Sequence, residues 1–155
     1  MKIFMKYFLL IFISVFSNQI WSQDIVINFG KEIKTAQTAE IYKNFLDKYF
    51  NDKCKIKINE TEIILKEKNF QNYANVAAKF APKIDKDFDI KIKDEKELDD
   101  NEIFVESFVK ISEQKILNVN CVIKNQKFSE IIFENLQLSL RQKLTLSLIV
   151  NLLRS

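Results

Sequence analysis

Two stretches of the chain space their apolar residues as an α-helix does. The first, over residues 38–50, places its apolar side chains at i, i+1, i+4, i+5, i+8 and i+9, which makes one broad stripe: Ile41, Tyr42, Phe45, Leu46, Tyr49 and Phe50. Thr38 is the expected N-cap of this helix, and Asn51-Asp52 the expected stop. The second stretch runs from Phe70 to Ala81, and Pro82 closes it because proline cannot continue a helix.

Elsewhere apolar and polar residues alternate, which is typical of strands with one buried face. The first pair covers residues 54–58 and 61–65, with a turn at Asn59-Glu60, and a third strand contains Phe88, Ile90 and Ile92. Four further alternating runs have short connections and predict an antiparallel meander: 102–111, 115–124, 136–140 and 144–150. Residues 128–133 fit a helix or a strand equally well.

Two other segments complete the expected layout. Residues 24–29 are predicted to be extended and to end at Gly30, and residues 94–102 are expected to form an exposed charged loop. The predicted fold class is α+β, with an antiparallel β-sheet of about five or six strands, a C-terminal meander and two helices packed on one face. This order of elements is compatible with cystatin-like and nuclear-transport-factor-like folds, and no motif identifies a family.

The N-terminus has the pattern of a secretory signal peptide. Lys2 and Lys6 provide the basic region, and an apolar run over residues 7–16 follows. This run is shorter than the about 20 apolar residues that a spanning helix needs. We therefore predict a signal peptide over residues 1–22, a single domain over residues 23–155 and a periplasmic or secreted location. Cleavage after Ser22 fits the small-residue preference, and cleavage after Ser17 is the alternative. No cysteine lies near the cut, so a lipid anchor is not expected.

Composition excludes several functional classes. The chain has no histidine, which removes Ser-His-Asp and Cys-His catalysis and histidine-ligated metal sites. Its single glycine excludes the phosphate-binding and dinucleotide-binding loops, so no cofactor is expected. The chain carries 24 Lys and Arg against 21 Asp and Glu, and two of the lysines lie in the leader. A nearly neutral mature domain argues against nucleic acid as a partner.

The two cysteines are the main candidate covalent feature. In an oxidising compartment, a disulfide between Cys54 and Cys121 is the favoured prediction, and two buried free thiols are the alternative. Asp85, Asp87 and Asp89 resemble the start of a calcium loop. Ile90 stands where that loop needs glycine and Lys96 where it needs glutamate, so we expect no metal site. The acids of residues 94–102 are expected to be solvated.

The candidate interaction patch is the pair Phe104 and Phe108. They lie on the strand face opposite Ile103, Val105 and Val109, and they either pack under the helices or line a surface for a partner. No catalytic constellation is recognisable. The leading hypothesis is a non-enzymatic module that binds another protein, such as a periplasmic inhibitor or an immunity-type protein, with no stable membrane insertion after the leader is removed. The alternatives are a carrier or sensor of a small apolar ligand held between sheet and helices and, third, a hydrolase that uses carboxylates.

Overall fold

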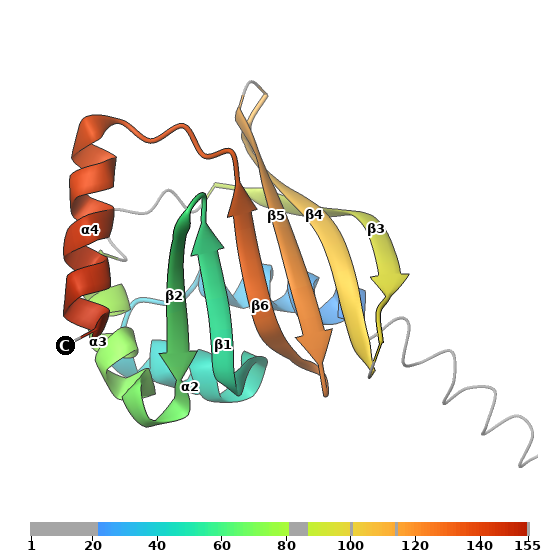
Figure 1. The fold of residues 1–155 in the computed structure, drawn as a ribbon, viewed down its shortest axis with the longest axis horizontal. Helices are drawn as coiled ribbons and strands as arrows, with labels where there is room; N and C mark the ends of the chain where they lie inside the picture. Colours follow the sequence, from blue (N-terminus) through green and yellow to red (C-terminus); the bar gives the residue numbers. More distant parts are fainter. Residues whose placement is uncertain (1–21, 81–86, 100, 114, 155) are drawn as a thin grey trace, which may run out of the picture.

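The fold is seen in a computed structural model that describes residues 22–80, 87–99, 101–113 and 115–154 (Figure 1). The predicted leader, apart from Ser22, lies outside these residues, as do Pro82 and Asp85. Six strands form one sheet in the order β2-β1-β6-β5-β4-β3. Their bounds are β1 Phe50–Ile58, β2 Thr61–Lys66, β3 Asp89–Glu97, β4 Glu102–Ser112, β5 Lys115–Lys124 and β6 Lys127–Glu134.

Neighbouring strands are antiparallel except at the centre of the sheet. There β1 runs parallel to β6, with Ile56 opposite Ile131. This contact joins the N-terminal hairpin β1–β2 to the meander β3–β6, and it makes one continuous sheet from two separate parts of the chain.

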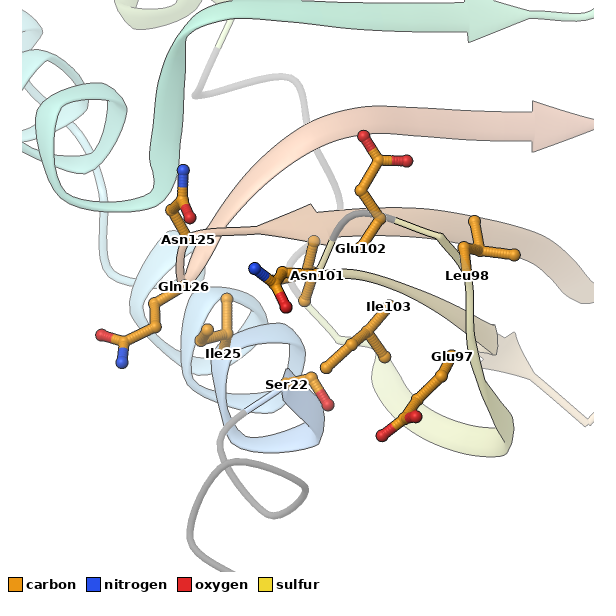
Figure 2. Close-up of a pocket in the computed structure, with 10 residues that line it drawn as sticks. Ser22, Ile25, Glu97, Leu98, Asn101, Glu102, Ile103, Asn125 and Gln126 are labelled. Atoms are coloured by element: carbon orange, nitrogen blue, oxygen red, sulfur yellow. The ribbon is translucent and has the colours of Figure 1, made fainter. Parts of the chain in front are cut away.

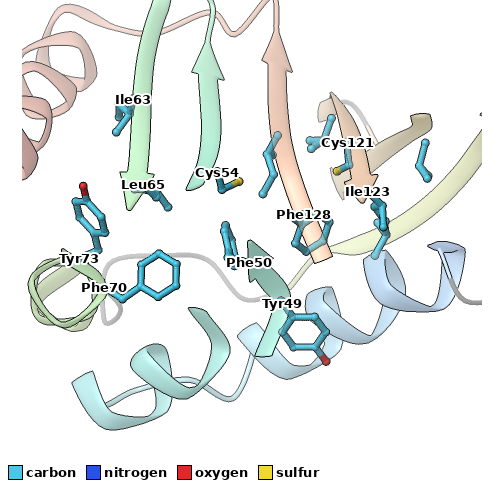
Figure 3. Close-up of a cluster of buried hydrophobic side chains, with 14 of the residues drawn as sticks. Tyr49, Phe50, Cys54, Ile63, Leu65, Phe70, Tyr73, Cys121, Ile123 and Phe128 are labelled. Carbon is cyan, nitrogen blue, oxygen red and sulfur yellow. The ribbon is translucent and has the colours of Figure 1, made fainter. Parts of the chain in front are cut away.

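Helices cover one face of the sheet. A helix occupies residues 22–33, followed by α2 Ala39–Tyr49, the short 3-10 helix η1 Glu67–Asn69, α3 Phe70–Phe80 and α4 Leu140–Arg154. Apolar side chains of the helices and of one sheet face form the main buried core, which includes Tyr49, Phe70 and Phe128 (Figure 3). A second, smaller cluster consists of Ala36, Tyr42 and Ala74. The opposite face of the sheet, which we call the outer face, points away from this core.

Much of the predicted layout is confirmed. The α+β class, the six-stranded sheet, the two amphipathic helices and the strands over 54–58, 61–65, 102–111 and 115–124 are all present. Thr38 caps α2, and its side chain accepts a hydrogen bond of 3.3 Å from the Ile41 amide. The ambiguous segment 128–133 is a strand, because it fills the gap between β5 and β1 at the centre of the sheet.

The extended segment predicted over residues 24–29 is wrong, because these residues are helical. Ile25, Val26 and Phe29 have the spacing i, i+1 and i+4, and all three pack on the core. Gly30 continues the helix instead of ending a strand. A Cβ atom at Gly30 would lie 2.2 Å from Cδ1 of Ile90, so its lack of a side chain lets the helix lie close to β3.

The charged loop predicted over residues 94–102 is half wrong. Residues 94–97 continue β3 and β4 begins at Glu102, so the described residues of this segment that lie outside strands are Leu98, Asp99 and Asn101. The charges are compatible with a strand here because β3 is the edge of the sheet, where charged side chains remain in solvent.

The strands predicted over residues 136–140 and 144–150 are also wrong. Residues 135–139 are irregular, and α4 follows. Ser139 and Gln142 form a reciprocal capping box: the Gln142 amide donates to Ser139 Oγ at 3.2 Å, and the Ser139 amide donates to Gln142 Oε1 at 2.8 Å. Leu146 and Val150, one turn apart, pack on the core, so the helix buries one face.

The predicted disulfide is absent, and Cys54 and Cys121 are free, buried thiols (Figure 3). Cys54 lies on β1 and Cys121 on β5, with β6 between these two strands. Two strand spacings amount to about 9–10 Å, which exceeds the roughly 7 Å limit between the Cα atoms of a disulfide. The strand order therefore keeps the thiols apart, and the alternative of two small apolar core residues holds.

Candidate functional site

A cavity of about 490 Å³ lies at one end of the sheet, beside the start of the helix over residues 22–33 (Figure 2). Ile25, Ile103 and Ile123 give it an apolar side, and polar residues of the β3–β4 and β5–β6 connections, including Asn101 and Asn125, line the rest. Asn125 and Gln126 both have positive φ, 52° and 64°, as a tight two-residue hairpin turn requires. This turn projects its side chains at the cavity mouth (Figure 2).

An irregularity in β3 brings carboxylates to the core side of the sheet at this end. Ile92 is opposite Ser107 and Asp94 is opposite Glu106, so Lys93 is the additional residue. Beyond it the alternation is reversed, and Glu95 and Glu97 lie on the same face as Ile90 and Ile92. The acidic cluster is therefore divided between the two faces of the sheet.

Glu95 joins β3 to the first helix. Its carboxylate accepts a hydrogen bond from the Ser22 hydroxyl and a second, of 2.7 Å, from the Gln23 side-chain amide. Ser22 is 2 % exposed, so this contact is a packed part of the fold. Glu97 lines the cavity together with Glu102, and Glu102 forms an ion pair of 3.5 Å with Lys124.

The perturbed groups of the described chain do not have the properties of a nucleophile or a general acid. Burial is the main cause that raises the pKa of Cys54 to about 12, and burial raises the pKa of Cys121 to about 12 as well, so both thiols stay protonated near neutral pH. The hydrogen bond from Lys48 lowers the pKa of Glu32, whereas a general acid near neutral pH needs a raised one.

Within the described residues, no group of three or more acids and cysteines is arranged to hold a metal ion. Of the calcium-like acids, Asp89 begins β3 and forms a weak ion pair of 3.9 Å with Lys34. Asp85 lies outside the described residues.

Phe104 and Phe108 both lie on the outer face of the sheet. Phe104 is opposite Lys96 on β3 and Val122 on β5, while Phe108 is opposite Lys91 and Asn118. Both phenylalanines are half-buried. A hollow of about 330 Å³ lies beside Phe104 and includes Leu98 in its lining. The two phenylalanines therefore do not pack under the helices and lie on the other face of the sheet.

A second apolar surface lies on α4 and was not expected from the sequence. Leu140, Leu144 and Leu148 are 75, 60 and 64 % exposed and follow one another at intervals of four residues. The sequence signal for this surface is the Ser139-x-x-Gln142 capping box, which marks the start of a helix. If the segment after it is helical, its leucines lie on two faces of that helix.

No family model and no curated protein matches this chain. A solved de novo designed NTF2 fold protein is 18% identical over 83% of this chain and 92% of its own, with a TM-score of 0.50. A DUF4783 family protein from Bacteroides uniformis is 18% identical, over 74% of this chain and 97% of its own, with a TM-score of 0.47. A domain of unknown function with a cystatin-like fold from Nostoc punctiforme is 10% identical, over 81% and 83%, with a TM-score of 0.48.

The likeness to the designed protein shows the fold and nothing beyond it. This chain has an α+β fold of the NTF2-like kind, in which the described residues form a six-stranded, mostly antiparallel sheet and four α-helices. Among the described residues, no helix has the length and apolar character required to cross a membrane.

Proposed function

We propose that this protein is a non-enzymatic module that binds another protein through the outer face of its sheet. The observation that carries the proposal is the pair of partly exposed phenylalanines on the outer face, Phe104 and Phe108, with a hollow beside Phe104. A partly exposed aromatic side chain beside a hollow, as Phe104 is, is a typical anchor of a protein interface. An exported inhibitor or immunity-type protein is the class that we favour.

The surroundings of the strip suit a reversible, specific contact. Lys91 and Lys96 border the phenylalanines on β3, and Glu106 lies between them on β4, where it pairs with Lys93 at 3.7 Å. Charges of both signs around an apolar centre match the usual division of an interface into an apolar core and a polar rim. The partner would therefore present an apolar side chain to the hollow and charged groups around it.

A capture experiment from periplasmic extract tests this proposal. The wild-type protein should retain a partner at native abundance, and the double variant Phe104→Ser with Phe108→Ser should recover at least 10-fold less of that partner. Because half-buried phenylalanines also support the sheet, Lys91→Glu with Lys96→Glu is the second variant, since both lysines are exposed. Leu144→Ser with Leu148→Ser on α4 is the matched control. Recovery of no partner, or equal recovery by all variants, would refute the proposal.

A carrier of a small ligand is the second candidate. It is favoured by the cavity of about 490 Å³ between the first helix and the sheet, which has the volume of a small-molecule site and an isoleucine-lined side. Native mass spectrometry of the protein as purified from its host should then show a bound mass. Ile103→Trp should remove that mass by filling the cavity. A protein without bound mass would count against this candidate.

A further inference from the structure

The exposed leucines of α4 form a stripe that the fold leaves without a partner among the described residues. Leu140, Leu144 and Leu148 lie on one side of the helix, with a rise of about 6 Å from each to the next. Leu146 and Val150 lie on the other side and anchor α4 to the core. Leu140, Leu144 and Leu148 are three of the most exposed large apolar side chains in the described structure, and they lie beside one another. A contiguous exposed stripe of this kind marks a contact surface.

The charge of α4 indicates what it contacts. The helix contains Arg141, Lys143 and Arg154 and no carboxylate. Neither Arg141 nor Lys143 forms an ion pair with a described residue. The positive end of the helix dipole lies at the same end as Leu140 and these two cations. Glu60 and Glu62 line a groove together with Lys143, so Arg141 is the cation that, with the leucines, favours an anionic apolar partner.

The two cations lie on opposite flanks of the stripe. Lys143 borders a groove between α4 and the β1–β2 turn, whose lining also includes Glu60 and Glu62. Arg141 lies on the other flank, because each residue advances 100° around the helix axis: Arg141 is 100° from Leu140 on one side, and Lys143 is 60° from Leu140 on the other. Arg141 therefore faces outward with the leucines. Figure 1 shows α4 at the β2 end of the molecule, and α4 contacts α3, so the stripe is not enclosed by the sheet.

From these features we infer that α4 docks reversibly on an anionic lipid surface, with the three leucines in the interface and Arg141 among the headgroups. A parallel pairing of two α4 helices would bring Arg141 and Lys143 against the same cations, with no carboxylate on either helix. A lipid surface supplies both an apolar layer for the leucines and negative charge for Arg141. Three leucines are a small apolar area, so binding depends on the fraction of anionic lipid and on salt.

Sedimentation with vesicles tests the inference on the exported protein as recovered from expressing cells. Vesicles with 30% phosphatidylglycerol should retain at least 10-fold more protein than pure phosphatidylcholine vesicles, and 0.5 M NaCl should release it. Leu144→Ser with Leu148→Ser should abolish retention, and Arg141→Gln should reduce it at least 3-fold. All variants share one N-terminus, so its contribution to binding is the same in every comparison.

Matched controls separate this inference from the proposed protein contact. Ile116→Ser removes another exposed apolar side chain, 55 % exposed on β5, and Lys115→Gln removes an exposed charge; both should bind like wild type. Phe104→Ser with Phe108→Ser should also leave vesicle binding unchanged. Equal retention on neutral vesicles would overturn the inference. So would a dimer, seen by sedimentation velocity, that the leucine variant dissolves.

Discussion

Gly30 offers the most direct test of how the first helix lies on the sheet. In a helix interior, Gly→Ala is normally stabilising, by about 1 kcal/mol. Here the added Cβ would lie 2.2 Å from Cδ1 and 3.1 Å from Cγ1 of Ile90, and Gly30 itself is buried. The substitution therefore sets a gain in helix propensity against overpacking between the helix and β3.

The expected balance is a loss of stability. Overpacking a well-filled interior costs about 1–3 kcal/mol, which exceeds the propensity gain over most of that range. We expect Gly30→Ala to lower the free energy of unfolding by about 1 kcal/mol, or the melting temperature by roughly 4 °C. Ile90→Val alone should cost about 1 kcal/mol. Because it removes the atom at 2.2 Å, Gly30→Ala should be neutral or stabilising in that background, with a coupling energy of about 1–2 kcal/mol.

Urea unfolding followed by circular dichroism measures all four proteins of the cycle, with an unchanged m-value as the condition for comparing them. Asn28→Ala is the matched control, because Asn28 is exposed on the same helix and its replacement should be stabilising by a few tenths of a kcal/mol. If Gly30→Ala stabilises the protein in the wild-type background, the close packing of this helix on Ile90 is refuted.

Three other predictions concern the thiols, the C-terminal segment and the leader. Cys54 and Cys121 should resist a thiol reagent until the protein unfolds; a mass 2 Da lower before reduction would contradict the free thiols. Since burial raises their folded pKa from 9.0 to about 12, the stability due to the protonated thiols should be complete below pH 9 and fall as the pH rises towards 12, which alkaline unfolding curves measure. The Asn59 side chain donates to the Leu136 carbonyl at 2.9 Å and accepts from the Leu136 amide at 2.8 Å. Glycine tolerates the φ of 53° at this position, so Asn59→Gly should remove only these bonds, lower the free energy of unfolding by about 1 kcal/mol and speed hydrogen exchange in α4. Unchanged exchange would show that this contact does not hold the helix. N-terminal sequencing of the exported protein should find Gln23 as its first residue, as a cut after Ser22 predicts; a chain that begins at Asn18 would support the alternative cut after Ser17.

The sequence predicted those elements whose periodicity has one interpretation. The stripe from Ile41 to Tyr49 predicted a helix correctly, although Phe50, the last residue of that stripe, begins β1, and the alternation in residues 115–124 predicted a strand correctly. Residues 24–29 are too short to show which period they follow, and Gly30 was interpreted as a stop. Its role depends on Ile90, which lies 60 residues further along the chain and contacts it only in the folded protein.

Candidate sites were less predictable because they depend on strand order. A sheet with β6 between β1 and β5 separates Cys54 from Cys121, although both side chains were correctly expected on buried faces. No local pattern shows that β6 pairs in parallel with β1. The additional residue in β3 is equally hidden, and it decides that Glu95 faces the first helix.

The error at the C-terminus has a different cause, which bears on function. A strand in a covered sheet needs apolar residues on one face, so the alternating apolar residues over 136–140 and 144–150, interrupted at Gln142, predict strands. A helix that only packs on a core needs one apolar stripe and would have shown the helical period clearly. α4 carries two stripes, Leu146 with Val150 towards the core and Leu140, Leu144 and Leu148 towards solvent, and together they imitate a two-residue alternation. The second stripe is mostly exposed to solvent, and this excess of leucine over what packing on the core requires is the reason for proposing a contact of α4 outside the molecule.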